Sequence, residues 1–316
     1  MQNLSLISRT LLALAASLLL FLAGVAIPAA GLVLFPFVPH PPLILGLRYG
    51  TAWGASVLLA ATLLLAIFAG KEVACIYGLF ALIAGLLFVL LGRLRAIEYL
   101  VATVAVVVFA AAAGLLTYLF GSWATMTREL HESMMQHMTS ALGAYEKMGL
   151  SRDSLDLLRE QIPQLAQTLF QLLPGLILLS LAVTVLINVL LVCRRFPERR
   201  GAWLSLEHLR DWKGPEPLVW GLIASGFVLL APGLDVLTPF ALNVLLVIAA
   251  CYFAQGLAII AFFFHKNNVP RFLRGITYVL IIFQQIFTLM VVGLGLFDLW
   301  GDFRRSKKNN LTPQAS

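Results

Sequence analysis

Long apolar runs separated by short polar segments dominate this 316-residue chain. Each run is close to the ~20 residues that a helix needs to cross a ~30 Å hydrocarbon core. The continuous runs are Leu11–Ile27, Thr51–Ala69, Val73–Leu91, Tyr99–Phe120, Leu165–Val192, Leu218–Leu234, Phe240–Phe264 and Ile276–Leu299. A further run, Ala30–Leu47, is broken by prolines. The pattern predicts nine membrane spans, or eight if the first run and the broken run form one.

The runs predict helices rather than barrel strands. They are too long for barrel strands and lack their alternation of apolar and polar positions, and backbone groups in lipid must be satisfied within a segment. The predicted fold class is all-α, a polytopic transmembrane helical bundle. The first run follows Arg9 and is interpreted as a signal anchor, because another apolar run follows at once. The composition agrees, since 12% of residues are charged against about a quarter in soluble domains.

The basic residues indicate orientation in the membrane rather than nucleic-acid binding, although the net charge is +7. With nine spans and the amino terminus in the cytoplasm, most of them fall inside, as the positive-inside rule requires. The residues placed inside are Arg9, Arg48, Arg93, Arg95, Arg194, Arg195, Arg199, Arg200, Arg210, Lys213, Lys266, Arg271 and Arg274. The basic tail after the last span conflicts with this scheme, because nine spans place it outside. Its side stays open.

Two segments are expected to leave the membrane. In 123–164, Leu130, Met134, Met138 and Leu142 recur every four residues, which is typical of an amphipathic helix. Gly149 breaks this helix, and a second helix ends at Pro163, which gives an extracytoplasmic helical hairpin. Segment 194–217 mixes arginines with tryptophans and predicts a basic cytoplasmic loop, either solvated or lying in the headgroup layer. The predicted organisation is a bundle at 1–122, the hairpin at 123–164, a second bundle at 165–303 and a polar tail at 304–316.

The sequence gives only weak support for a metal site. His131-Glu132 starts like the zinc-protease motif HExxH, but position 135 is Met135, so the motif is incomplete. His131, Met134, Met135 and Met138 share one helical face, which predicts apolar packing, with a Cu(I) site as the alternative. Cys75, Cys193 and Cys251 form no CxxC pair. We therefore predict no metal and no cofactor.

Catalysis is not expected either. The continuous apolar runs carry no carboxylate, lysine or histidine at mid-span, and the chain has no GxSxG, P-loop or GxGxxG motif. We predict that the protein is not an enzyme and that any energy source comes from a partner.

The proline-broken run is the predicted ligand site. Prolines remove backbone donors at membrane depth, so polar groups from other spans should converge there. The candidate ligand-binding residues are Pro39, His40, Pro42, Arg48, Asn188 and Gln255. Two alternatives stay open: Arg48 extends to the headgroups, and the amides join helices without binding a ligand. Small residues predict close helix packing at Gly50, Gly54, Ala250, Ala254 and Ala258.

Several blocks of the carboxy-terminal half carry a family resemblance. They are Leu173-Pro174-Gly175 with Asn188, Leu209-Arg210-Asp211-Trp212 with Pro217, Tyr252-Phe253-Ala254-Gln255-Gly256-Leu257 and the segment 295–304. These blocks resemble the YybS family of predicted bacterial membrane proteins, which implies a bacterial inner-membrane location and no known activity. The amino-terminal half, from Pro41-Pro42-Leu43 through Arg48-Tyr49-Gly50 and Gly54, is similar to the substrate-binding components of energy-coupling-factor transporters and to MreD.

Two functions fit these observations. The first is a solute-binding or transport-related component without its own nucleotide site, working in the bilayer with another membrane subunit or energising complex. The second is a non-transporting scaffold in cell-envelope assembly. A closed polar cavity near the outer leaflet would favour the first, and a solid core the second.

Overall fold

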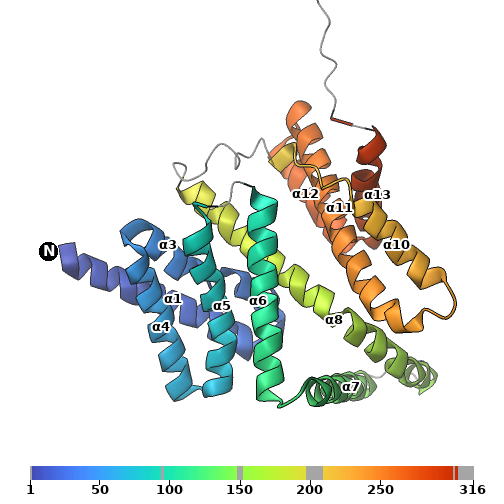
Figure 1. Ribbon diagram of the computed structural model, residues 1–316, viewed down its shortest axis with the longest axis horizontal. Coiled ribbons are helices and arrows are strands. Elements are labelled where there is room, and N and C mark those ends of the chain that lie inside the picture. The colour runs from blue at the N-terminus through green and yellow to red at the C-terminus, as the bar shows by residue number, and fades with distance from the viewer. Residues whose placement is uncertain (1, 94–95, 148–151, 197–208, 302, 305–316) are drawn as a thin grey trace, which may run out of the picture. The chain divides into compact units, whose positions relative to one another are not determined.

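The computed structural model describes residues 2–93, 96–147, 152–196, 209–301 and 303–304. Helices form every regular element within these ranges, and no strand occurs in them. The predicted all-α class is therefore confirmed. The chain divides into two compact units, Met1–Leu204 and Ser205–Ser316, and we describe each by itself (Figure 1).

The helices of the first unit are α1 (Gln2–Ala26), α2 (Pro28–Leu34), η1 (Phe35–Phe37), α3 (His40–Tyr49), α4 (Thr51–Phe68), α5 (Lys71–Leu90), α6 (Ile97–Leu119), α7 (Trp123–Lys147) and α8 (Arg152–Arg195). Those of the second unit are α10 (Leu218–Leu230), η3 (Asp235–Leu237), α11 (Thr238–Lys266), α12 (Arg271–Phe283) and α13 (Gln285–Gly301). Much of the expected basic loop 194–217, and the tail from 305 onward, lie outside the described residues.

The number of spans is smaller than the nine expected. The described residues form seven helices long and apolar enough to cross a membrane, or eight if α12 and α13 count as one span. The difference arises at two places. Helix α10 has 13 residues, so it is about 20 Å long at 1.5 Å per residue, which is short of a ~30 Å core. Helices α12 and α13 replace one continuous span and meet at a bend of 102°.

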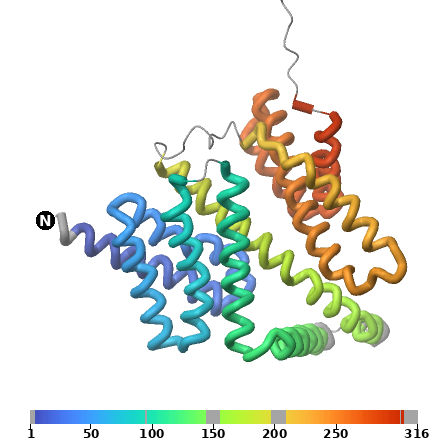
Figure 2. Tube along the Cα trace, viewed as in Figure 1, coloured from blue at the N-terminus to red at the C-terminus, as the bar shows by residue number. Residues whose placement is uncertain are grey.

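Helices α3, α4, α5 and α6 of the first unit pack side by side in chain order (Figure 2). Helices α1, α4 and α5 surround the proline-broken segment α2–η1–α3. Their shared core consists of Phe21, Val38, Ala61, Leu65, Ala74 and Tyr77. Helices α3 and α4 approach closely at Gly46 and Gly54, where a Cβ on Gly54 would lie 2.8 Å from the Pro42 carbonyl oxygen. Much of α3 is thus buried, whereas α2 exposes Leu32 and Val33 at the surface.

Helix α7 packs against the first part of α8, and we call this helix pair the hairpin. Figure 1 shows α7 nearly end-on where α6 is seen from the side, so α7 runs across the direction of α6. Met135 and Met138 pack on a small core formed by Leu142, Leu155 and Ile162. The expected break at Gly149 falls outside the described residues.

The prediction that Pro163 ends a separate helix is wrong, because α8 continues through Pro163 and Pro174 to Arg195. Pro163 is exposed, so water or lipid headgroups can satisfy the carbonyl that the proline leaves without a donor.

The second unit is built on the close approach of α11 and α13. A Cβ on Gly256 would collide with the Val291 carbonyl oxygen, and a Cβ on Gly295 would collide with that of Tyr252. Helix α10 packs on α11 through Ile248, whose Cδ1 lies 2.6 Å from the position of a Cβ on Gly221. Glycine at these crossings lets the backbones touch, which is typical of helix packing in lipid.

Candidate functional site

The proline-broken segment leaves backbone carbonyls without their usual donors. The carbonyl of Val38 would accept from residue 41 or 42 in a continuing helix, but Pro41 and Pro42 have no N–H. Ser17 of α1 donates to this carbonyl at 2.9 Å. Since the single proton of Ser17 is used there, the Tyr77 hydroxyl, 2.9 Å away, must donate to Ser17. Ser17 and Tyr77 are both fully buried, so this chain of bonds satisfies the break internally.

The side-chain amide of Asn188 supports the same segment. In the 3₁₀ turn, the carbonyl of Pro36 would accept from residue 39, but Pro39 lacks the donor. Asn188 of α8 supplies it, with Nδ2 2.8 Å from the Pro36 oxygen and 2.8 Å from the Thr184 oxygen. Oδ1 of Asn188 and Nδ1 of His40 are also buried, and these two side chains interact with each other. Polar side chains from α1, α5 and α8 thus meet the polar groups of the broken segment.

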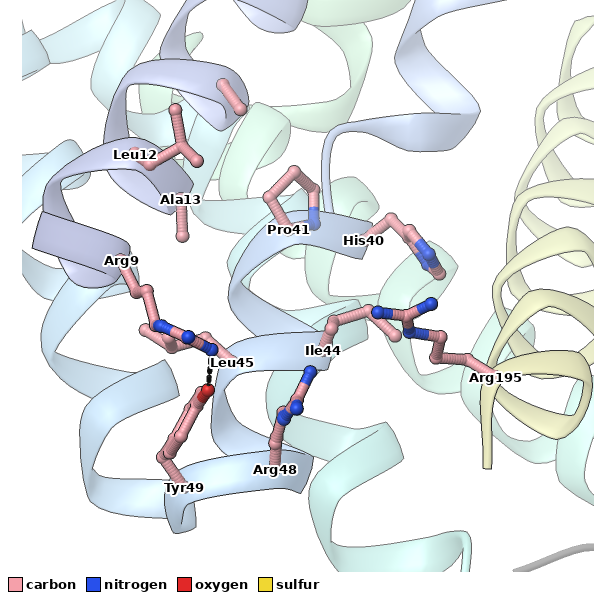
Figure 3. A pocket seen from close by; sticks show the side chains of 11 residues that line it. Arg9, Leu12, Ala13, His40, Pro41, Ile44, Leu45, Arg48, Tyr49 and Arg195 are labelled. Atoms are coloured by element: carbon pink, nitrogen blue, oxygen red, sulfur yellow. Dashed lines mark hydrogen bonds between the residues drawn. The ribbon is translucent and has the colours of Figure 1, made fainter. Parts of the chain in front are cut away.

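Three arginines converge next to this segment. Arg9 comes from α1, Arg48 from the last turn of α3 and Arg195 from the end of α8. They line a surface groove of about 510 Å³ together with His40 and Tyr49. Figure 3 shows Arg195 extending from α8 toward His40 and Arg48. The rest of the wall is apolar, formed by Leu12, Ala13, Ala16, Pro41, Ile44 and Leu45. We call this site the arginine groove.

Tyr49 holds two of the guanidinium groups in the arginine groove. The carbon Cζ of Arg9 lies 5.4 Å from the centre of the Tyr49 ring, and that of Arg48 lies 5.5 Å from it. Arg9 also donates to the Tyr49 hydroxyl. No lining residue is an aspartate or a glutamate, and among the described residues none of the three arginines forms an ion pair. The groove thus gathers positive charge without an internal counter-ion.

The second unit contains a buried polar cluster of a different kind. Asp298 is 1% exposed and accepts from Arg304 at 2.6 Å and from Gln255 at 3.1 Å. Its other oxygen accepts from the Phe303 backbone at 3.0 Å. Gln255 in turn accepts from the Gly214 N–H at 3.0 Å. We call this set of groups the Asp298 cluster.

Arg304 extends the Asp298 cluster to the start of the second unit. Its Nη1 donates to the carbonyls of Arg210 and Trp212, at 2.8 and 2.9 Å. These bonds fix the segment before α10 and the segment after α13 to each other. The cluster is a structural joint, because its carboxylate and its amide already have partners.

The predicted ligand-binding residues therefore separate into two groups. His40 and Arg48 line the arginine groove, while Asn188 reaches the adjoining segment through Pro36. Pro39 precedes α3, and Pro42 is buried within it. Gln255 lies in the second unit, bonded to Gly214 and Asp298. Sequence reasoning missed Ser17, Arg9 and Arg195, which no local pattern connects to the prolines.

The predicted packing residues also differ in their roles. Gly54 packs closely, whereas Gly50 has φ +114° and no atom within 4 Å of the position that a Cβ would take. Gly50 thus forms the turn between α3 and α4, where a left-handed backbone favours glycine. On α11, Ala258 is buried and Ala250 is partly buried, but Ala254 is exposed. The close contact of this helix is displaced to Gly256, because glycine allows a nearer approach than alanine.

One apolar cavity lies between α6, α7 and α8. It has a volume of about 150 Å³ and is lined by residues such as Phe109, Met126, Leu130 and Pro174. The His131 ring stacks edge-on against Phe170, with the ring centres 5.2 Å apart. Together with the packing of Met135 and Met138, this contact assigns the methionine face to the interior of the hairpin. No group of histidine, cysteine or acidic side chains suited to a metal occurs in the described residues.

The chain belongs to a family of predicted membrane proteins, DUF2232, whose model matches residues 15–299. No curated protein and no solved structure shows a significant match to the chain. The family places the protein in a membrane.

Proposed function

We propose that this integral membrane protein is a solute-binding or transport-related component that takes an anionic solute into the arginine groove. The observation that supports this proposal is the convergence of three guanidinium groups with no carboxylate beside them. Like charges held together repel one another, so an anion from outside the chain would stabilise the site. The groove volume, about 510 Å³, lies in the range of about 300–1,000 Å³ that is usual for ligand sites.

The proposed orientation places the arginine groove at the cytoplasmic side. Arg9 lies near the start of α1, and Arg48 and Arg195 lie in the last turns of α3 and α8. The positive-inside rule assigns all three positions to that side. The resemblance to the YybS family supports a bacterial inner membrane. A groove facing the cytoplasm differs from the closed cavity near the outer leaflet that a simple uptake component would need, so the proposed solute is received from the inner leaflet or the cytoplasm.

The second unit suggests how the basic tail fits this orientation. Arg304 binds the carbonyls of Arg210 and Trp212, so the chain leaves α13 at the same end at which it enters α10. Arg274 of α12 binds the carbonyl of Phe264, near the end of α11, at 3.2 Å. We propose that α10, although shorter than a full span, crosses outward, that α11 returns, and that α12 and α13 form a re-entrant pair. The tail then lies inside with the other basic segments, and the conflict with nine spans disappears.

Cysteine labelling tests this topology. In a background without Cys75, Cys193 and Cys251, single cysteines replace Ser140, Ser205 or Ser306. Ser306→Cys should react from the cytoplasmic side together with Ser205→Cys, while Ser140→Cys reacts from the opposite side. Labelling of Ser306→Cys together with Ser140→Cys would contradict the re-entrant pair.

An alternative function, a non-transporting scaffold, is favoured by the hairpin. Helix α7 exposes a polar face with Arg128, Glu129, Glu132 and Gln136, while its apolar face packs within the hairpin. Such a face could bind a partner outside the membrane.

Native mass spectrometry of the full chain in mild detergent separates the two functions. A solute-binding component should retain a small anionic molecule, and Arg48→Gln should release it. Arg93→Gln, an exposed arginine outside the groove, is the matched control and should keep it. Retention of a protein partner without any small anion would favour the scaffold.

A further inference from the structure

We infer that the ligand of the arginine groove is the phosphate monoester headgroup of a membrane lipid. This inference rests on the proposed function and specifies its ligand. It draws on three properties of the groove: its charge, its donor geometry and its apolar wall.

The charge of the groove matches a dianion. Three guanidinium groups face a common space without a carboxylate among the lining residues. Guanidinium groups stay protonated in proteins. A phosphate monoester carries about −1.5 to −2 charges near pH 7, whereas a carboxylate or a phosphodiester carries one. A phosphate monoester therefore neutralises more of the site than either of these alternatives.

The donor geometry favours a phosphate as well. Each guanidinium presents a planar fork of N–H donors that binds a phosphate through two parallel bonds. Arg9 and Arg48 are positioned by the ring of Tyr49, and Arg195 approaches from another helix (Figure 3). Donors from separate directions suit a tetrahedral group with several acceptor oxygens better than a flat carboxylate.

The apolar wall indicates that the phosphate belongs to a lipid. Leu12 and Ala16 of α1 and Ile44 of α3 belong to the apolar wall of the groove, and Leu12 is 70% exposed. In a membrane this surface meets acyl chains rather than water. A lipid can place its phosphate among the guanidinium groups and its chain along this wall, whereas free phosphate would leave the wall uncovered. The arginines stand at span ends, which is the depth of lipid headgroups.

Lipid retention by the full chain tests the inference. The protein in neutral detergent is mixed with dioleoyl phosphatidic acid or with dioleoyl phosphatidylcholine, and bound lipid is counted by native mass spectrometry. Wild type should retain phosphatidic acid in preference to phosphatidylcholine. Arg195→Gln should lower this retention about tenfold, since one charge-assisted contact is lost. Arg194→Gln removes the same charge from an exposed neighbour outside the groove and should have no effect.

Other results would overturn the inference or one part of it. Equal loss in Arg194→Gln and Arg195→Gln would overturn the inference, because general surface charge would then explain the binding. Thermal protection by inorganic phosphate that depends on Arg195, without retention of phosphatidic acid, would overturn the lipid as the source. Retention of oleate that depends on Arg195, without phosphatidic acid, would overturn the phosphate but keep the proposed function. If no anion depends on Arg48 or Arg195, the proposed function fails as well.

Discussion

Arginine has opposite surroundings in the two units. In the second unit, Arg304 is 9% exposed and bonded to Asp298 at 2.6 Å. In the first unit, the three arginines of the groove are exposed, and none forms an ion pair within the part of the chain that the structure describes. A buried charge is tolerated where a carboxylate and backbone carbonyls compensate it. An exposed group of like charges has no such compensation and is available to a ligand.

Polar side chains therefore have different roles in the two units: those of the Asp298 cluster stabilise the fold, and those of the arginine groove are available to a ligand. The Asp298 cluster joins the segment before α10 to the segment after α13, so it determines how the second unit closes. In the arginine groove, Arg9 of α1 bonds to Tyr49 of α3, while the three arginines also face an open site. Substitutions in the two regions should therefore change different properties, stability in one and ligand binding in the other.

The largest expected effect is that of Asp298→Asn. This change leaves Arg304 buried without a counter-ion, which should lower the free energy of unfolding by about 3–5 kcal/mol. Denaturant titration in mild detergent measures it. Asp235→Asn is the control, since Asp235 is exposed and its loss should cost less than about 0.5 kcal/mol. Equal effects of the two changes would mean that the buried pair does not stabilise the second unit.

The next effect concerns the crossing of α11 and α13. Gly295→Ala places a Cβ against the Tyr252 carbonyl, and this overpacking should lower stability by about 1–3 kcal/mol. Gly293→Ala on the same helix has no atom within 4 Å of the new Cβ. It should be neutral or stabilising by up to about 1 kcal/mol, because alanine favours helices over glycine. If the two variants unfold alike, the close crossing is not present in solution.

The support of the proline-broken segment predicts an effect of comparable size. Asn188→Leu removes the donor to the Pro36 carbonyl and should cost about 1–3 kcal/mol, the range for an unsatisfied buried group. Thr62→Val serves as the control, because the Thr62 hydroxyl bonds only within its own helix, to Leu58, and its loss should stay within about 0.5 kcal/mol. If Asn188→Leu is as stable as wild type, water donates to the Pro36 carbonyl in place of the amide.

The smallest effect is expected at Ala254. Because Ala254 is exposed, Ala254→Leu should change stability by less than about 0.5 kcal/mol. Gly256→Leu, on the buried face of the same helix, should lower stability by more. Thermal unfolding of both variants in detergent compares them. A loss of more than about 1 kcal/mol for Ala254→Leu would restore the alanine stripe as a packing face.

The apolar runs were sufficient to predict the helices and the break at the prolines. Their length and the missing N–H groups of proline are local properties, which the sequence states directly. Asn188 could be connected to the break because a buried amide in a span needs a partner. Ser17 could not, since a serine in an apolar run is common and its partner, Val38, lies 21 residues away.

The sequence was less informative where distant segments meet. The arginine groove combines the first turns of α1 with the last turns of α3 and α8, and no sequence pattern pairs Arg9 with Arg195. The bend between α12 and α13 lies at Gln284 and Gln285, within a run that otherwise has the length of a span. Two adjacent polar residues in the middle of that run were its only local signal. The continuation of α8 through Pro163 depends on the exposure of that residue, which the sequence does not reveal.

Thermal unfolding of Arg48→Gln and Arg304→Gln, with and without phosphatidic acid in neutral detergent, tests the contrast between the two units most directly. Without lipid, Arg304→Gln should lower the melting temperature, because it leaves Asp298 buried without its partner. Arg48→Gln should not lower it, since it removes a charge that has no counter-ion. Phosphatidic acid should raise the melting temperature of wild type but not of Arg48→Gln. Equal destabilisation by the two changes, together with equal protection by the lipid, would contradict this account.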